Sequence, residues 1–294
     1  MKFQRIPFYM VRGAARVVGP RGFQSRASRK LRFLAYRNFR HEPRPDDVFI
    51  ATYPKSGTTL MQMMVYQLST DGSLDIDHIG DCVPWFEVVG ANKPGYLERL
   101  PSPRFFKTHL RYHELPRQGR IIYVLRDVRD VAVSYYHHAA TGWDMDFDKF
   151  LQRFLAGKVP VGSWFDHLEA WWPERHSSRV LFLRYEDVVV DLRGTAERVA
   201  RFCSLEVDAA RLDRVAERCS FDFMRAHNHL FDPRLFVLRE RPGRTQPFIR
   251  RGEVGSWRDE TTPAQIDRMH RYFERVRRKL GRDDSDLVAL DPRT

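Results

Sequence analysis

The sequence has few cysteines and no long run of apolar residues. Of its 294 residues only Cys82, Cys203 and Cys219 are cysteines, and no two of them form a CxxC pair. This odd, widely spaced set does not fit the disulfide framework of a small secreted protein, so we expect a reducing compartment. No stretch reaches the roughly eighteen apolar residues that a membrane-spanning helix needs, and arginines interrupt the first twenty residues. We therefore expect neither a membrane span nor a secretory signal.

Acidic residues are almost absent from the N-terminal arm, residues 1–45. The arm holds twelve Lys and Arg against one acid, Glu42, whereas the remaining 38 Lys and Arg are matched by 37 Asp and Glu. The arm therefore carries +11 of the net charge of +12, and this charge gives no indication of a nucleic-acid partner for the rest of the chain. Apolar residues interleave with the arginines of the arm. Three interpretations stay open: a segment that contacts a membrane surface, an organelle presequence or a solvated extension.

Apolar runs alternate with helical patterns along residues 46–294, which we expect to form one domain. The 43% of hydrophobic residues excludes a disordered chain. Runs rich in strand formers lie at residues 48–52, 105–106, 121–125 and 180–183. Helical patterns lie at residues 59–68, 127–138, 147–155, 163–172, 191–202, 209–219 and 263–280. This alternation predicts an α/β fold with a mostly parallel central sheet flanked by helices.

The first motif that carries chemistry joins a predicted strand to a predicted helix. It reads Tyr53-Pro54-Lys55-Ser56-Gly57-Thr58-Thr59. Free backbone N–H groups at a helix N-terminus favour an anion, Gly57 lets the backbone approach a phosphate, and Lys55 adds a mobile positive charge. The ATP-type P-loop spacing is missing, because Lys55 precedes Gly57. The alternative is an ordinary strand-to-helix turn that contains a lysine.

Together with three later motifs, this loop resembles the phosphosulfate-binding loop of cytosolic sulfotransferases. The later motifs are Lys107-Thr108-His109, the stretch from Arg126 to Ser134, and Arg250-Arg251-Gly252. All four follow the family's order, so the resemblance covers most of the chain after the arm. It implies a P-loop NTPase-like fold and transfer of a sulfuryl group from 3′-phosphoadenosine 5′-phosphosulfate (PAPS) to a hydroxyl or amine of a small acceptor.

His109 is the expected general base. A histidine has a near-neutral pKa and can therefore accept a hydroxyl proton at physiological pH. A lone histidine at a strand end is more often structural. Lys107 lies two residues earlier, on the same side of an extended chain, and this pairing favours a catalytic role.

The resemblance assigns the other site residues. Lys55 and Lys107 would stabilise charge on the sulfuryl group and the departing oxygen, and Ser134 would hold Lys55 away until the acceptor binds. Arginine suits the 3′-phosphate because its planar fork donates two hydrogen bonds. The residues implied at the cofactor are Lys55, Ser56, Gly57, Thr58, Thr59, Leu60, Arg126, Ser134, Tyr185, Ser220, Phe221, Phe248, Arg250, Arg251 and Gly252.

Two features depart from the family's pattern. Leu60 stands where tryptophan is common, which removes one surface for stacking the adenine and leaves more of that contact to Phe221. The family's dimerisation signature survives only as Arg258, Thr262-Pro263 and Asp267. We therefore expect at most a weak homodimer.

Two further segments have simpler interpretations. Asp127 and Asp130 are expected to cap the start of a helix and to pair with Arg129. Residues 228–257 show little periodicity, which is typical of a functional loop or lid.

No metal site is expected, because no His, Cys and carboxylate cluster has metal-ligand spacing and fixed cations supply the charge instead. The acceptor is expected to be apolar or lipid-like, and the protein cytoplasmic, with or without contact to a membrane surface through the arm. Two other functions stay open. One is a P-loop nucleotide kinase, which would need the missing glycine spacing. The other is a non-enzymatic protein that binds nucleotides or polyanions through residues 1–45.

Overall fold

The computed structural model describes residues 42–87, 95–140, 145–231, 248–281 and 284–293. Almost all of the basic arm lies outside these residues, as do residues 232–247 of the stretch 228–257 that was predicted as a loop or lid.

Four parallel strands form the central sheet, in the order β2-β1-β3-β4. They span Val48–Thr52 (β1), Phe105–Thr108 (β2), Arg120–Leu125 (β3) and Val180–Arg184 (β4). The four predicted strands and their parallel pairing are confirmed. All five residues of β1 are buried, because helices cover both faces of the sheet.

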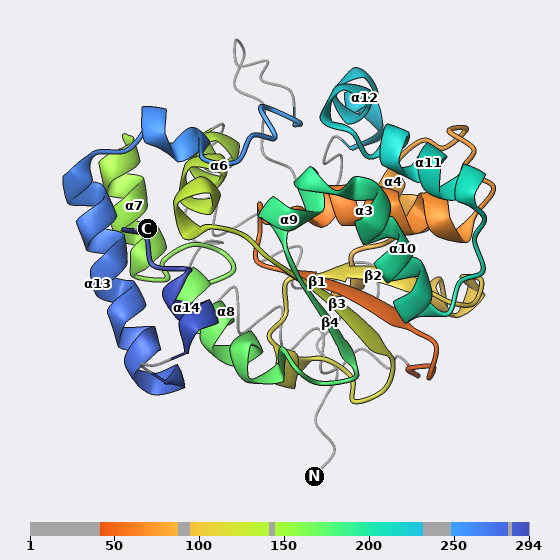
Figure 1. The fold of residues 1–294 in the computed structure, drawn as a ribbon, viewed down its shortest axis with the longest axis horizontal. Helices are drawn as coiled ribbons and strands as arrows, with labels where there is room; N and C mark the ends of the chain where they lie inside the picture. The colour runs from red at the N-terminus through yellow and green to blue at the C-terminus, as the bar shows by residue number, and fades with distance from the viewer. Residues whose placement is uncertain (1–41, 88–94, 141–144, 232–247, 282–283, 294) are drawn as a thin grey trace, which may run out of the picture.

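Successive residues of β1 point into two different cores. Phe49 and Ala51 belong to an aromatic-rich cluster on one face, and Val48 and Ile50 belong to a methionine-rich cluster on the other. Figure 1 shows the corresponding two groups of helices on opposite sides of the strands. The first cluster is covered by α6 (Val128–Ala140), α7 (Phe147–Leu155), α8 (Trp164–Trp171), α13 (Pro263–Leu280) and α14 (Ser285–Val288). The second is covered by α3 (Thr58–Ser69), α9 (Tyr185–Val190), α10 (Leu192–Cys203), α11 (Ala209–Arg218) and α12 (Phe221–Ala226).

The long predicted helices are present within a few residues of their expected ends, whereas the short ones were missed. The helices α9 and α12 contain six residues each, and α4 (Ile79–Cys82) and α14 contain four. An amphipathic pattern needs about three turns to be recognised, so elements of one or two turns leave no clear periodic signal. The remaining short elements are the 3-10 turns Leu97–Arg99 (η1), Tyr112–Glu114 (η2), Trp172–Glu174 (η3), Asn228–Leu230 (η4) and Ser256–Asp259 (η5).

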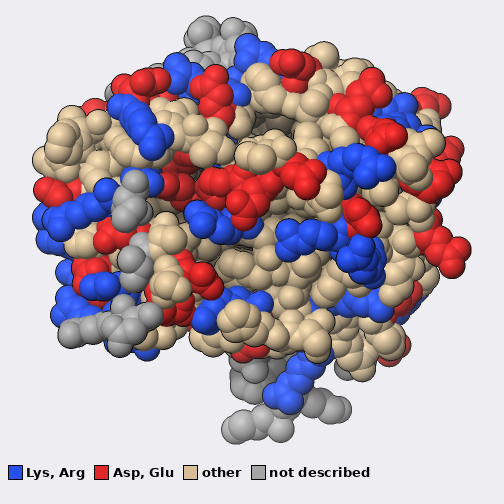
Figure 2. Space-filling model, in the orientation of Figure 1, with Lys and Arg blue, Asp and Glu red and all other residues tan. Residues whose placement is uncertain are grey.

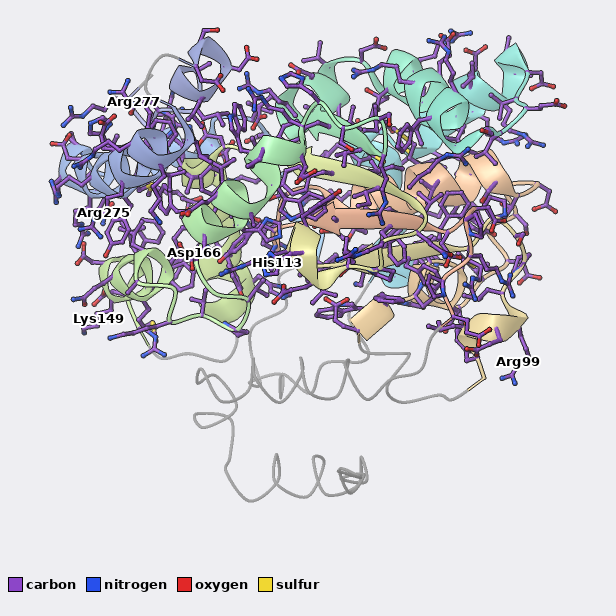
Figure 3. The ribbon with its side chains drawn as sticks, turned by 90° about the horizontal axis from the view of Figure 1, so that it is seen from below. Arg99, His113, Lys149, Asp166, Arg275 and Arg277 are labelled. Atoms are coloured by element: carbon purple, nitrogen blue, oxygen red, sulfur yellow. The ribbon has the colours of Figure 1, made fainter. Side chains whose placement is uncertain are left out.

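The surface of the described residues carries charges of both signs. Acidic and basic side chains are intermixed over the face shown in Figure 2. In Figure 3, Arg99, Lys149 and Arg275 lie at the rim of the molecule, on η1, α7 and α13. This mixture agrees with the near balance of charge outside the arm. Within the described residues, no helix combines the length and the apolar character needed to cross a membrane.

Candidate functional site

The strand register gathers the predicted motifs at one edge of the sheet. Ala51 of β1 is paired with Thr108 of β2, and Thr52 is paired with Val124 of β3. Leu125 of β3 is paired with Arg184 of β4. The residues that follow these pairs, namely the loop after Thr52, His109, Arg126 and Tyr185, therefore emerge together at the carboxyl ends of the strands. The chain passes from β1 to β2 on one side of β1 and then from β2 to β3 on its other side, so the strand order reverses at β1. Open α/β sheets bind ligands at this kind of point.

The backbone of the loop after β1 takes up a conformation suited to close contact with a ligand. Lys55 has φ 72° and Gly57, the N-cap of α3, has φ 92°, so both are left-handed. A side chain on Gly57 would be strained, because its Cβ would lie 2.6 Å from the ring of Tyr185. No side chain caps α3 and no acid stands in its first turn, so its N-terminal N–H groups face no negative charge of their own helix.

Two buried hydrogen-bonding groups at this loop support an anionic ligand. The Ser56 hydroxyl and the Nε of Arg126 are buried and have no hydrogen-bond partner among the described residues. Arg126 donates to the carbonyl of Lys55 and to that of Glu253, each at 3.1 Å, and its guanidinium lies 4.3 Å over the ring of Tyr185. Buried donors of native proteins are normally satisfied, so these two fit the oxygens of a bound phosphate.

Two lysines at this site have lowered pKa values, one in the loop and one on β2. Burial, with the nearby charges of Arg126, Arg250 and Lys107, lowers the pKa of Lys55 to about 8. Burial also lowers the pKa of Lys107 to about 8, and the Glu87 carboxylate offsets part of that effect. Lysines whose pKa lies this close to physiological pH become fully charged when an anion binds beside them.

Each lysine ammonium group lies over an aromatic ring. The Nζ of Lys55 is 4.5 Å from the ring centre of Phe248, and the Nζ of Lys107 is 5.0 Å from that of Trp85. Trp85 also packs edge-on against His109, with ring centres 5.1 Å apart. Aromatic faces of this kind hold a cation without neutralising it, so both charges stay available to a ligand.

The contacts of His109 determine which of its nitrogens can act as a base. Its Nδ1 lies 2.8 Å from the carbonyl oxygen of Thr52. A carbonyl can only accept, so Nδ1 carries the proton and donates it, and the lone pair resides on Nε2. The backbone N–H of His109 donates to Glu87 at 2.9 Å. Both anchors hold the imidazole at the end of β2 with Nε2 as the proton acceptor.

Ser134, Thr59 and Leu60 lie on the two helices that border the loop. Ser134 is half-buried on α6, and the described residues show no hydrogen bond between it and Lys55. The predicted role of Ser134 at Lys55 stays a prediction. Thr59 is half-buried in the first turn of α3, and Leu60 is buried in the methionine-rich core cluster. The hydroxyl of Thr58 is 2.6 Å from that of Thr52, which ties α3 to the end of β1.

The residues implied around the adenine have contacts within the protein. Tyr185 donates its hydroxyl to the carbonyl of Gly252 at 3.1 Å. Ser220 caps α12 by accepting the N–H of Phe223 at 3.3 Å. Phe221 packs so closely under Gly252 that a Cβ there would lie 2.4 Å from its ring. These contacts bring α9, α12 and the segment around Gly252 together beside the loop.

The two arginines of the fourth motif lie beside acidic residues. Arg250 forms an ion pair with Glu260 at 3.0 Å, and Arg251 lies 3.7 Å from the same carboxylate. His137 of α6 forms a further short contact with Glu260. The sequence analysis did not single out Glu260, because a carboxylate ten residues from an arginine has no helical or strand spacing that would pair them.

His138 is a further site residue that sequence reasoning missed. It follows Ser134 by one turn of α6, and its ring is 5.8 Å from that of Phe248. Burial and the charges of Lys55, Lys107 and His109 lower its pKa to about 3, so this imidazole is neutral at physiological pH. The spacing of four residues from Ser134 was the available signal.

The expectation for Asp127 and Asp130 is half right. Asp127 pairs with Arg129 at 2.5 Å, as predicted. Asp130 does not pair with Arg129 and instead accepts hydrogen bonds from residues 255–257. A helix-capping pattern in a sequence cannot reveal a partner 125 residues away.

The described residues contain one group with donor atoms placed for a metal ion, and it lies away from this site. His270, Glu274 and Asp291 have ligand atoms within 4.8 Å of one another. His270 is already 2.7 Å from Asp291, and Glu274 is 2.9 Å from Arg277. These contacts account for the cluster as one hydrogen-bonded pair and one ion pair within the protein.

Comparisons with known proteins agree on one family. The profile of the family described as Sulfotransferase domain matches residues 45–283. Sulfotransferase 1E1 of Mus musculus is 33% identical over 249 residues, which cover 79% of this chain and 83% of that protein. Sulfotransferase 1E1 of Homo sapiens is also 33% identical, over 79% of this chain and 84% of that protein.

Solved structures show the same fold. Mouse sulfotransferase SULT7A1, complexed with PAP, superposes with a TM-score of 0.69 at 25% identity, over 88% of this chain and 91% of that chain. Retinol dehydratase, in complex with androsterone and the inactive cofactor PAP, gives a TM-score of 0.70 at 24% identity, over 87% of both chains.

Proposed function

The chain belongs to the sulfotransferase family and is a PAPS-dependent sulfotransferase, and we propose that the residues gathered at the carboxyl edge of its sheet perform the transfer with His109 as base. One observation carries this assignment of roles. The carbonyl of Thr52, the residue just before the loop 53–57, fixes His109 in the tautomer that leaves Nε2 as proton acceptor. Base and anion loop are thereby joined in one site.

The nucleotide would bind along this edge through fixed positive groups. The loop around Gly57 and the N-terminus of α3 face the 5′-phosphosulfate, with the Ser56 hydroxyl as an additional donor. Arg126 and Arg250 face the 3′-phosphate, and Arg251 stands beside them. Tyr185 and Phe221 are the aromatic residues nearest to the adenine in this arrangement. PAP, the product that remains after transfer, is present in the related mouse structure.

The proposed reaction is an in-line transfer. Nε2 of His109 takes the proton of the acceptor hydroxyl while that oxygen forms a bond to sulfur. The bond between sulfur and the bridging oxygen of the 5′-phosphate breaks, and Lys55 stabilises the charge left on that oxygen. Lys107 stabilises the charge on the sulfuryl oxygens. Catalysis then rests on positioning and on charge stabilisation in a partly buried site.

Fixed cations also supply what a metal ion supplies in phosphoryl transfer, so we propose that the reaction needs no metal. Lys55, Lys107, Arg126 and Arg250 already concentrate positive charge around the loop, since each of the last three lies close enough to lower the pKa of Lys55. Turnover should be unchanged by a chelator such as EDTA, and a loss of activity restored by added metal would contradict this.

The acceptor is proposed to be a small molecule that enters beside Trp85 and Phe248, the rings that lie under the two lysines. Androsterone, the molecule in the retinol dehydratase complex, belongs to the apolar alcohols that the sequence analysis favours. A lipid-like acceptor and a cytoplasmic location with membrane contact through the arm are further parts of the proposal. Deletion of residues 1–40 should then lower binding to anionic liposomes, and unchanged binding would exclude the membrane contact.

Turnover tests this function directly. Purified protein is incubated with PAPS and a panel of phenols, steroid alcohols, fatty alcohols and amines, and PAP release is measured. PAP release that depends on at least one acceptor is the expected result. The proposed function would be contradicted if no acceptor of any class increased PAP release and the protein had no affinity for PAP.

A further inference from the structure

Asp130 connects two parts of the cofactor site that lie far apart in the sequence. It stands in the first turn of α6 and is 1% exposed. Its carboxylate accepts the N–H of Gly255 at 2.8 Å, the N–H of Trp257 at 3.2 Å and the hydroxyl of Ser256 at 3.3 Å. These three residues end the stretch 250–257, called here the Arg250 segment, which carries both arginines of the fourth motif.

The N–H groups that donate to Asp130 have no acceptor within their own turn. Gly255 is the N-cap of η5, has φ 81° and offers no side chain for capping. The first N–H groups of a helical turn lack internal partners, so an acceptor must come from elsewhere. Asp130 supplies it from α6. Its own buried charge is balanced by these donors and by Arg126, whose Nη2 lies 3.8 Å away.

Four further contacts hold the Arg250 segment against the body of the protein. Arg225 of α12 donates to the carbonyl of Arg250 at 2.7 Å. Arg126 donates to the carbonyl of Glu253, and Tyr185 donates to the carbonyl of Gly252. The guanidinium of Arg129 lies 4.0 Å over the ring of Trp257. The segment is thus docked along its length on the strand ends, α6 and α12 by contacts within the protein.

We propose that Asp130 is a positioning residue for the cofactor, which holds the Arg250 segment on α6 in its binding conformation before the nucleotide arrives. The inference rests on the proposed function, in which this segment contacts the 3′-phosphate. Ordering a loop at the moment of binding consumes part of the binding free energy. A segment docked in advance by a buried carboxylate avoids that cost, and it keeps Arg250, like Arg126, near Lys55.

The variant Asp130→Asn tests this role. One of the two carboxylate oxygens becomes an NH₂ group, which then faces N–H donors and cannot accept from them. We expect the Kd for PAP and the KM for PAPS to rise about ten-fold, the size of effect typical for loss of a buried charge-assisted hydrogen bond. The KM for the acceptor and kcat should change less than two-fold. The affinity for adenosine 5′-monophosphate, which lacks the 3′-phosphate, should also change less than two-fold.

Asp208→Asn is the control, because Asp208 also accepts a backbone N–H at a helix start, that of Arg211 on α11 at 2.8 Å, and makes none of the contacts to the Arg250 segment given above. It should leave the PAP affinity unchanged. A uniform loss of affinity for PAP and adenosine 5′-monophosphate in Asp130→Asn would mean general damage and would overturn the positioning role. An unchanged or tighter Kd for PAP would overturn it as well.

A measurement on the unaltered protein covers the case in which Asp130→Asn does not fold. Hydrogen exchange of the amides of Gly255 and Trp257 is followed without ligand. Slow exchange before PAP is added is the expected result, because both N–H groups are bonded to Asp130. Exchange that becomes slow only with PAP would refute prior docking. Failure of the unaltered protein to bind PAP would count against the proposed function instead.

Discussion

His109 is held so that only one of its nitrogens can take a proton. The Thr52 carbonyl receives the Nδ1 hydrogen, and Glu87 receives the backbone N–H. Burial raises the pKa of Glu87, so this carboxyl is easier to protonate than an exposed one. A hydrogen bond from a backbone N–H favours its ionised form, and Lys107 nearby acts in the same direction.

Replacement of His109 should remove the base and spare the cofactor site. The variant His109→Asn keeps a side-chain N–H that can donate to the Thr52 carbonyl, but it has no group that accepts a proton at neutral pH. We expect kcat to fall about 10²- to 10⁴-fold, the range for loss of a general base. Steady-state assays measure kcat. Calorimetry on the variant should give the same affinity for PAP as that of the unaltered protein. Activity within a factor of a few would exclude His109 as the base.

The lowered pKa of Lys55 predicts how PAP binding depends on pH. In the ligand-free protein this pKa is about 8, so the ammonium group loses its proton as the pH rises through 8. Bound phosphate favours the charged form, and the phosphates of PAP are already ionised above pH 7. The loss of this charge should therefore raise the Kd for PAP about ten-fold between pH 7 and pH 9.

Lys55→Arg provides the control for this pH dependence, since an arginine stays charged throughout the range. Its affinity for PAP should vary less between pH 7 and pH 9 than that of the unaltered protein. Equal pH dependence of the two proteins would show that Lys55 is not the titrating group.

Several site residues could be predicted from the sequence because each follows a recognisable strand. Lys55, His109 and Arg126 come directly after apolar runs, and parallel strands place such residues at one edge. His138 could not be found in the same way, because its place beside Lys55 depends on the packing of α6 against Phe248. Its low pKa follows first from burial and then from charged groups on two other segments of the chain, the loop after β1 and the end of β2.

At the scale of elements, α6 and the Arg250 segment form one unit. Two carboxylates connect α6 with this part of the chain, one on α6 and one just after the segment. Asp130 of α6 accepts from the segment, and Glu260, just beyond η5, contacts His137 of α6. Glu260 also pairs with Arg250, and both side chains are 22% exposed. A phosphate that binds Arg250 therefore approaches a negative charge.

Removal of the Glu260 charge should strengthen PAP binding. In Glu260→Gln the repulsion between carboxylate and 3′-phosphate is lost, while the amide can still accept from Arg250. For a partly exposed pair we expect the Kd for PAP to fall about two- to five-fold, with less effect on adenosine 5′-monophosphate. Asp259→Asn is the control, because Asp259 is largely exposed and lies 3.8 Å from Arg251. A weaker PAP affinity in Glu260→Gln would show that Glu260 orients Arg250 instead.

The sequence predicted the long elements better than the joints between them. Apolar runs such as residues 121–125 identify buried strands, and the period of α13 identifies a long amphipathic helix. The contacts of Thr262 and Pro263 were not foreseen. Thr262 accepts the N–H of Gln265 and Pro263 occupies the first turn, so both build the start of α13. These local contacts depend on packing at the helix start, and the weak homodimer stays a prediction.

At the scale of the whole molecule, the charge of this protein has two separate origins. The arm contributes nearly all of the net charge, and the domain is balanced overall but concentrates cations at one edge of its sheet. A protein that bound nucleotides through the arm would lose binding with residues 1–45 and would not respond to changes at Arg126. The site described above requires the opposite.

Calorimetric titration with PAP, and with ATP and magnesium, of the unaltered protein and of Arg126→Ala tests this requirement most directly. The account predicts a Kd for PAP in the micromolar range or below, weaker binding of ATP, and loss of PAP binding in Arg126→Ala by at least about ten-fold, as expected for a buried arginine that pairs with phosphate. Tighter binding of ATP than of PAP, or PAP binding that is unaffected by Arg126→Ala, would contradict it.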